Sequence, residues 1–179
     1  MRLLLLAFTF FFYTEISAQE NYIYENNLIS LNLLSTTVPI IEGELNGKKA
    51  FFIVDTGSTI TVLDILKRKY FGFSIYKNIS KKLHGFGGKS LKLWLLFDTH
   101  LKLGGKLIAT NYTGTPLNKL KDSILETTGY EISGVLGSDV IRDYGIIVDY
   151  VNLRCLIGVG KDNGNSNEKK SCIVYEGVE

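Results

Sequence analysis

The residues best suited to chemistry lie in the segment FFIVDTGSTITVLDI (51–65), where an apolar, β-branched run leads directly into an acid, Asp55. A charge taken out of water in such surroundings is costly unless it is paired, hydrogen-bonded or protonated. Thr56, Gly57 and Ser58 follow at once and indicate a tight turn. A carboxylate held on a turn at the end of a strand suits proton transfer, so Asp55 is the candidate catalytic residue.

The turn itself permits two interpretations. Gly57 allows the backbone to bend sharply and to bring its N–H toward the carboxylate with no Cβ in the way. The same residues also fit an ordinary Asx-type turn after a strand. The motif alone therefore does not decide between a catalytic and a structural role.

Acid–base hydrolysis by carboxylates needs two of them, because acids about 3 Å apart cannot both ionise and so divide the roles of acid and base. The sequence has one Asp-Thr-Gly turn. The other Asp-Thr pair, at Asp98, continues with His100 where a glycine is required. We therefore expect a homodimer, in which twofold symmetry places two copies of Asp55 opposite each other.

The elements that must position this acid are mostly strands. Asn46-Gly47 predicts a hairpin between two strands, the second of which ends at the acid. A short helix is expected after the turn, ending at Gly72. Alternation of leucines with Lys92 and Trp94 predicts a half-buried strand, and a second turn is expected at Gly104-Gly105.

The C-terminal third is less regular. The stretch 111–132 is predicted to be a loop containing one helical turn. The segment SGVLGSDVIRDYGIIVDYVNLRCLIG (133–158) predicts a buried strand, then a short helix capped by Ser138 or Asp139, and a final hairpin bent at residues 151–152.

Three motifs in this order resemble those of retropepsin-like aspartic proteases of the single-domain, secreted bacterial type. They are VDTGST after an apolar strand, a glycine-rich hairpin some thirty residues on, and GVLGSDVIRDYGIIVDY near the end. The resemblance covers about residues 38–158. It implies a mostly β fold, a retropepsin-like acid-protease closed barrel with one or two short helices, and neither a cofactor nor a metal.

The resemblance also implies roles for the turn. Asp55 would be catalytic, Thr56 would hydrogen-bond across the dimer axis, and Ser58 would donate to the outer oxygen of the Asp55 carboxylate. Asp139, where relatives have a polar side chain at the start of the last helix, would cap that helix or bond Arg142. Retroviral enzymes of this family interleave their chain termini in a sheet shared by two subunits.

The segment HGFGGKS (84–90) would be the flap, a hairpin that closes over the substrate and excludes water. The residues expected to bind substrate there are Gly85, Phe86, Gly87 and Gly88. A solvent-exposed hairpin turn is the alternative interpretation. The function implied is an aspartic endopeptidase acting on protein or peptide substrates. It would be either a protease with many substrates or a processing protease that cleaves one partner. The alternative is a peptide-binding module of the same fold without catalysis.

The first 18 residues have the layout of a secretory signal peptide: a positive start, an apolar run and small residues before Gln19. This predicts a protein that is periplasmic or secreted, with no stable membrane insertion after cleavage. The remaining chain would consist of an N-terminal arm (19–37), the protease domain (38–160), and a polar linker and tail (161–179).

The composition of the chain also bears on which kinds of partner and ligand it is expected to bind. The net charge of +2 is too small to favour nucleic acid or an anionic membrane as a partner. With two cysteines and two histidines, no metal-binding pattern is visible. Cys155 and Cys172 would form one disulfide in an oxidising compartment or remain two free thiols.

Overall fold

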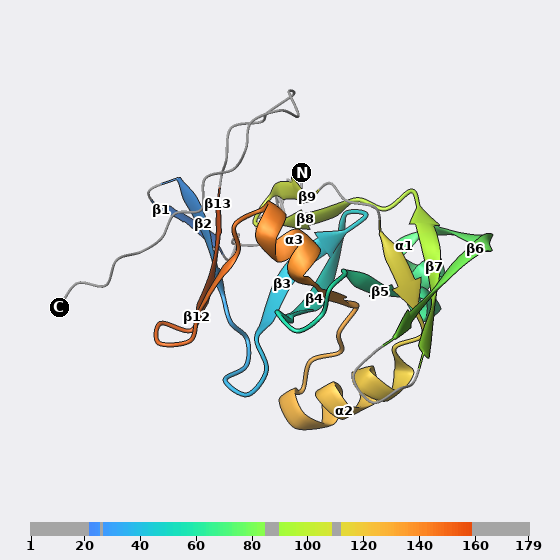
Figure 1. Cartoon of the computed structure of the whole chain (residues 1–179). Helices are drawn as coiled ribbons and strands as arrows, with labels where there is room; N and C mark the ends of the chain where they lie inside the picture. The colour runs from blue at the N-terminus through green and yellow to red at the C-terminus, as the bar shows by residue number, and fades with distance from the viewer. Residues whose placement is uncertain (1–21, 26, 85–89, 109–111, 159–179) are drawn as a thin grey trace, which may run out of the picture.

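The computed structural model describes residues 22–25, 27–84, 90–108 and 112–158 (Figure 1). The larger sheet contains β3 (Ile40–Leu45), β4 (Lys48–Val54), β5 (Val62–Asp64), β6 (Ser74–His84), β7 (Ser90–Phe97), β8 (Leu101–Leu103), β9 (Lys106–Ile108), β10 (Thr113–Thr115) and β11 (Gly134–Leu136). The smaller sheet contains β1 (Tyr22–Glu25), β2 (Leu28–Asn32), β12 (Ile147–Asp149) and β13 (Arg154–Gly158). The helical segments are η1 (Ile65–Lys67), α1 (Arg68–Phe71), α2 (Asn118–Thr128) and α3 (Ser138–Asp143).

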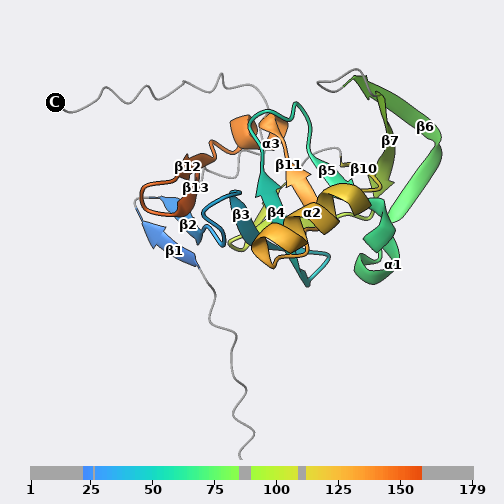
Figure 2. The same ribbon diagram turned by 90° about the horizontal axis from the view of Figure 1, so that it is seen from below.

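Two sheets dominate this arrangement, as the sequence predicts for a mostly β protein. The nine-stranded sheet has the order β6-β7-β10-β5-β11-β4-β3-β8-β9, and it curls around the main core (Figures 1 and 2). The four-stranded sheet has the order β1-β2-β13-β12. The helical segments described are short, the longest being α2 with 11 residues.

Strand β4 is apolar because both of its faces are covered. Phe52 and Val54 are buried in the main core, whereas Ile53 belongs to a second cluster on the other face of the sheet. Ile124 of α2 packs in that second cluster, so the helix covers the face that the main core leaves open. A strand buried on both faces reads as a continuous apolar run rather than an alternating one.

The predicted turns before and after the acid are confirmed. Asn46 and Gly47 have φ values of 51° and 73°, the pair of positive values that a tight two-residue hairpin turn requires, and they join β3 to β4. Gly72 ends α1 with φ of 80°, a left-handed conformation that favours glycine.

The central feature of the large sheet is the insertion of β11 between β4 and β5. Strand β11 is parallel to β4, with Leu136 opposite Val54, and antiparallel to β5, with Val135 opposite Val62. Because β4 and β5 are not neighbours, the turn that joins them (55–61) crosses the end of β11 (Figure 2). The acid at the end of β4 therefore lies beside the loop that follows β11.

Helix α2 differs from the prediction of a loop with one helical turn. It has three turns, is anchored by the buried Ile124, and ends at Gly129 with φ of 77°. No side chain caps its first turn, and Thr127 and Thr128, which are poor helix formers, occupy its end. The usual sequence signals of a helix are therefore weak here. The packing of Ile124 in the second cluster stabilises a helix that residue propensities alone favour only weakly.

The small sheet is built by one chain. Strands β1 and β2 lie in the predicted N-terminal arm, and β2 pairs with β13 from Leu28–Gly158 to Asn32–Arg154. Strand β13 in turn pairs with β12 through the predicted final hairpin. The tail (161–179) lies outside the described residues, so a sheet shared between subunits stays a prediction.

Cys155 is a free thiol in β13 and is wholly buried. Burial in apolar surroundings raises the pKa of this thiol to about 12, so it is protonated and unreactive at neutral pH. Cys172 and the predicted signal peptide lie outside the described residues. Over the part of the chain that is described, no helix has the length and hydropathy needed to cross a bilayer.

Gly137, the residue after β11, allows the closest approach in the fold. A Cβ placed on it would lie 2.4 Å from the backbone C and O atoms of Ile60. We expect Gly137→Ala to lower the free energy of unfolding by about 1–3 kcal/mol or more, because backbone on both sides resists displacement. Chemical denaturation followed by circular dichroism measures the change.

Gly158→Ala is the matched control, because its Cβ would meet only Tyr144 O at 3.4 Å, an ordinary contact. Equal unfolding free energies for the two variants would contradict the close packing of the turn against the β11–α3 loop.

Candidate active site

Asp55 stands where the buried part of β4 ends. Val54 is 3% exposed, but the side chain of Asp55 is exposed to solvent. Its Oδ1 accepts a hydrogen bond of 2.9 Å from the N–H of Gly57, and its own N–H donates to Leu136 O at 2.9 Å. The apolar strand therefore fixes the backbone of the acid and leaves the carboxylate open to a partner, a substrate or water.

Ser58 does not take the role that the resemblance implies. Its hydroxyl donates to Ile60 O at 2.8 Å rather than to the Asp55 carboxylate, and a hydroxyl has only one hydrogen to donate. Its main-chain N–H closes the turn by donating to Asp55 O at 3.2 Å. Ser58 thus shapes the turn, while the contact expected of the exposed Thr56 with a second subunit stays a prediction.

The turn is held from outside by Asp139. Its Oδ2 accepts from the N–H of Thr61 at 2.9 Å, and its Oδ1 accepts from the Thr61 hydroxyl at 2.7 Å and from the N–H of Val140 at 2.8 Å. The same hydroxyl oxygen accepts from the N–H of Gly137 at 3.0 Å. We call these two side chains, Thr61 and Asp139, the brace.

Further hydrogen bonds run alongside the brace. The N–H of Ser138 donates to Ser58 O at 2.7 Å, and the Ser138 hydroxyl contacts Thr59 O at 3.4 Å. Both ends of the Asp55 turn are therefore attached to the residues that follow β11. This fixes the position of the carboxylate relative to the rest of the sheet.

The brace corrects one sequence-based expectation. Neither Ser138 nor Asp139 caps α3, whose N-cap residue is Gly137 with no side-chain hydrogen bond. The interaction with Thr61 was missed because the two residues are 78 positions apart and no local pattern links them. The sequence does hold a weak signal for this contact, which is the type of each residue. Thr61 carries a hydroxyl between two apolar residues, and Asp139 is an acid just after Gly137.

Asp64 lies in the same apolar segment but differs from Asp55 in its surroundings. It is 1% exposed, and its Oδ1 accepts from the N–H groups of Leu66 and Leu117. Its Oδ2 is buried without a hydrogen-bond partner among the described residues. Asp64 joins the start of η1 to the chain before α2, and being closed to solvent it is not available to a substrate.

The residues expected to form the flap, Gly85, Phe86, Gly87 and Gly88, lie outside the described residues. The strands on either side of them are described: β6 runs to His84, and β7 begins at Ser90 directly opposite. The chain therefore forms a hairpin at the place where the flap is expected. Its contact with substrate stays a prediction.

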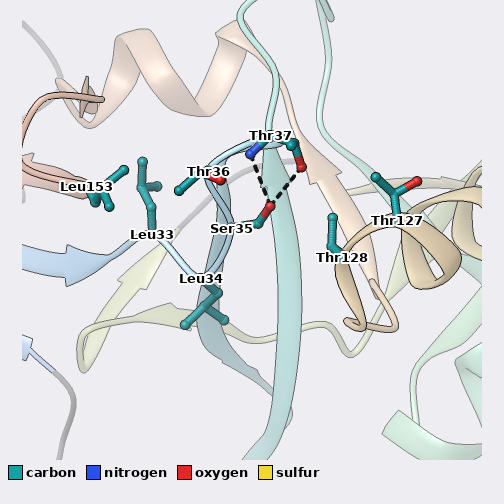
Figure 3. Close-up of a pocket in the computed structure, with 8 residues that line it drawn as sticks. All are labelled: Leu33, Leu34, Ser35, Thr36, Thr37, Thr127, Thr128 and Leu153. Carbon is teal, nitrogen blue, oxygen red and sulfur yellow. Dashed lines mark hydrogen bonds between the residues drawn. The ribbon is translucent and has the colours of Figure 1, made fainter.

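A pocket of about 430 Å³ is lined by residues other than those of the Asp55 turn (Figure 3). It is lined by Leu33, Leu34, Ser35, Thr36, Thr37, Thr127, Thr128 and Leu153. Two of its hydroxyls, those of Ser35 and Thr37, hydrogen-bond to each other at 3.0 Å. It contains no titratable group, so it does not compete with the Asp55 turn as a place for hydrolysis.

A metal site is not formed by the described residues, among which no three His, Cys, Asp or Glu side chains are grouped to hold an ion. The turn itself offers a solvent-exposed carboxylate on a backbone that is held by hydrogen bonds. Such a group acts as a base, as an acid, or as one member of a pair.

Similarity to known proteins is found among solved structures. The sequence matches no family model and no curated protein. Among solved structures, the chain is similar to a retropepsin-like aspartic protease from Rickettsia conorii, with 20% identity, a TM-score of 0.47, and coverage of 76% of this chain and 95% of that one.

Two further structures show a comparable likeness. One is EIAV protease in complex with the inhibitor HBY-793, with 18% identity, a TM-score of 0.45 and coverage of 60% and 88%. The other is the retroviral protease-like domain of Ddi1 from Leishmania major, with 10% identity, a TM-score of 0.44 and coverage of 70% and 96%.

The brace generates a prediction about stability. Asp139→Ala leaves the Thr61 hydroxyl and two main-chain N–H groups without their acceptor, so the free energy of unfolding should fall by about 1–3 kcal/mol. Asp139→Asn keeps one carbonyl acceptor and should lose less. Asp122→Ala, on the exposed face of α2, is the control. If Asp139→Ala unfolds at the same denaturant concentration as the control, the brace does not hold the turn.

Proposed function

We propose that this protein is an aspartic endopeptidase that works as a homodimer, with one Asp55 from each chain. The observation that carries the proposal is a solvent-exposed carboxylate at the end of a doubly buried strand, on a turn attached to the β11–α3 loop. A general acid or base must be both accessible and fixed in position, and Asp55 meets both conditions.

In the proposed mechanism the two carboxylates share one proton. The ionised member takes a proton from a water molecule placed between them, and that water attacks the scissile carbonyl carbon. The protonated member then donates to the departing nitrogen. The two apparent pKa values belong to the pair, so activity should have a maximum between them. No residue becomes covalently attached to the substrate.

The N–H of Gly57 supports this chemistry from within one chain. Its hydrogen bond to Asp55 Oδ1, 2.9 Å long, orients the carboxylate. A pair of identical acids needs such orientation, because a proton is shared only when the two inner oxygens face each other.

A second candidate function is peptide binding without hydrolysis. The observation that favours it is the four-stranded sheet, which a single chain completes from β1, β2, β13 and β12. One chain supplies all four described strands of this sheet, whereas retroviral enzymes of the resembled family share such a sheet between two subunits. A monomer would present one Asp55 and could hold a peptide but could not form the pair.

The sequence also supports a cellular location for either function. The predicted signal peptide (1–18) leads us to propose export, to the periplasm or the outside of the cell, where protein or peptide substrates would be met. Detection of a mature chain beginning near Gln19 outside the cytoplasm tests this location.

The catalytic role of Asp55 is tested by Asp55→Asn. Cleavage of an unfolded protein at acidic pH should fall by at least about 10²–10⁴-fold, because an amide neither shares a proton nor activates water. Asp98→Asn is the matched control: it changes the other Asp-Thr pair, at an exposed position. Retained cleavage in Asp55→Asn would place the chemistry elsewhere.

The dimer is tested by dilution. Since each active site needs two chains, specific activity should rise with protein concentration until the dimer is saturated, in parallel with the mass measured by analytical ultracentrifugation. Activity that is proportional to concentration throughout, from a species that stays monomeric, would rule out the paired mechanism. A monomer without activity at any concentration would favour the binding module.

A further inference from the structure

We propose that strands β6 and β7 form a docking surface for an acidic, extended segment of the substrate, beside the Asp55 turn. This inference rests on the proposed function and specifies its substrate class. We call the two strands the basic hairpin surface.

Positive charge is concentrated in this part of the chain. Between Phe73 and Phe97 there is no Asp or Glu. Four lysines of the same stretch lie in β6 and β7, namely Lys77, Lys81, Lys82 and Lys92. The rest of the chain carries 16 basic and 18 acidic residues, so the excess of positive charge in the protein comes from these two strands.

The register brings two of these lysines together. Lys82 is directly opposite Lys92 in the antiparallel pairing of β6 with β7. Like charges in this relation destabilise a sheet unless something compensates them. No Asp or Glu within the described residues forms an ion pair with Lys92, which is exposed and lies 5.3 Å from the centre of the Trp94 ring. The charge is therefore available to a ligand.

The edge of the sheet favours an extended ligand. Strand β6 is the outermost strand at one end of the nine-stranded sheet, with β7 as its neighbour. An edge strand has backbone groups that can pair with an added strand. Lysines on an edge strand discourage pairing with a neutral strand, which would leave their charges uncompensated, and they repel a basic strand. An acidic strand instead gains favourable charge interactions with them. The same residues thus select one class of partner and discourage others.

The basic hairpin surface lies close enough to Asp55 for one substrate to reach both. Trp94 pairs with Gly114, and Gly114 pairs with Leu63, eight residues after the acid. Adjacent strands are about 4.8 Å apart, so Trp94 is ~10 Å from Leu63.

The protein carries its own probe for this surface, since Trp94 is its only tryptophan. The experiment titrates the uncleaving variant Asp55→Asn with two peptides of equal length, one rich in Glu and Asp and the other with Gln and Asn at the same positions. We expect saturable change in Trp94 fluorescence with the acidic peptide, at least about fivefold tighter binding than its amide counterpart, and weakening as salt is added.

Lys92→Glu should remove the preference for the acidic peptide. Lys119→Glu, an equal change of charge at an exposed position of α2, should leave the preference intact. The proposal is overturned if both peptides bind with the same affinity or if the acidic peptide gives no saturable signal. It is also overturned if the two variants lose the preference equally, because the preference would then depend only on the net charge of the protein.

Cleavage by the unmodified chain separates this proposal from the proposed function. If both peptides are cleaved with the same kcat/KM and bound equally, the endopeptidase stands and the docking surface fails. If neither is cleaved at any concentration while the acidic peptide binds with the expected preference, the docking surface stands and hydrolysis fails.

Discussion

The position of strand β11 between β4 and β5 is the constraint on which the rest of the site depends. It separates two strands that follow each other in the chain, so the turn between them must cross the end of a third strand. That crossing is possible only because Gly137 has no side chain where the backbone of Ile60 passes. The shape of the Asp55 turn is therefore imposed by a distant segment more than by the preferences of its own residues.

Three acids around this crossing illustrate how one fold gives carboxylates different tasks. Asp55 is exposed and bonded once by a main-chain N–H, so it is free to react. Asp139 accepts three hydrogen bonds from Thr61 and Val140 and serves to position the turn. Asp64 is buried and connects two chain segments through main-chain N–H groups. Burial and hydrogen bonding, not residue type, distinguish the accessible acid from the two structural ones.

Those features of the fold and the site that depend on neighbouring residues in the sequence were predictable. The Asn46-Gly47 hairpin, the end of a helix at Gly72 and the acid after an apolar strand follow from turn chemistry and periodicity. Interactions between distant residues were not predictable in this way. The link from Thr61 to Asp139, the direction of the Ser58 hydroxyl and the stabilisation of α2 by Ile124 all depend on which segments the fold brings together.

The separation of the brace along the chain has a consequence for biosynthesis. Thr61 and its acceptor are 78 residues apart, and the strand that underlies the turn begins only at Gly134. A polypeptide emerging from the ribosome therefore exposes Asp55 long before anything can orient it. The carboxylate acquires its geometry only after residues 134–140 have been made and have joined the sheet, and a chain that stops before them has the acid without the segments that position it.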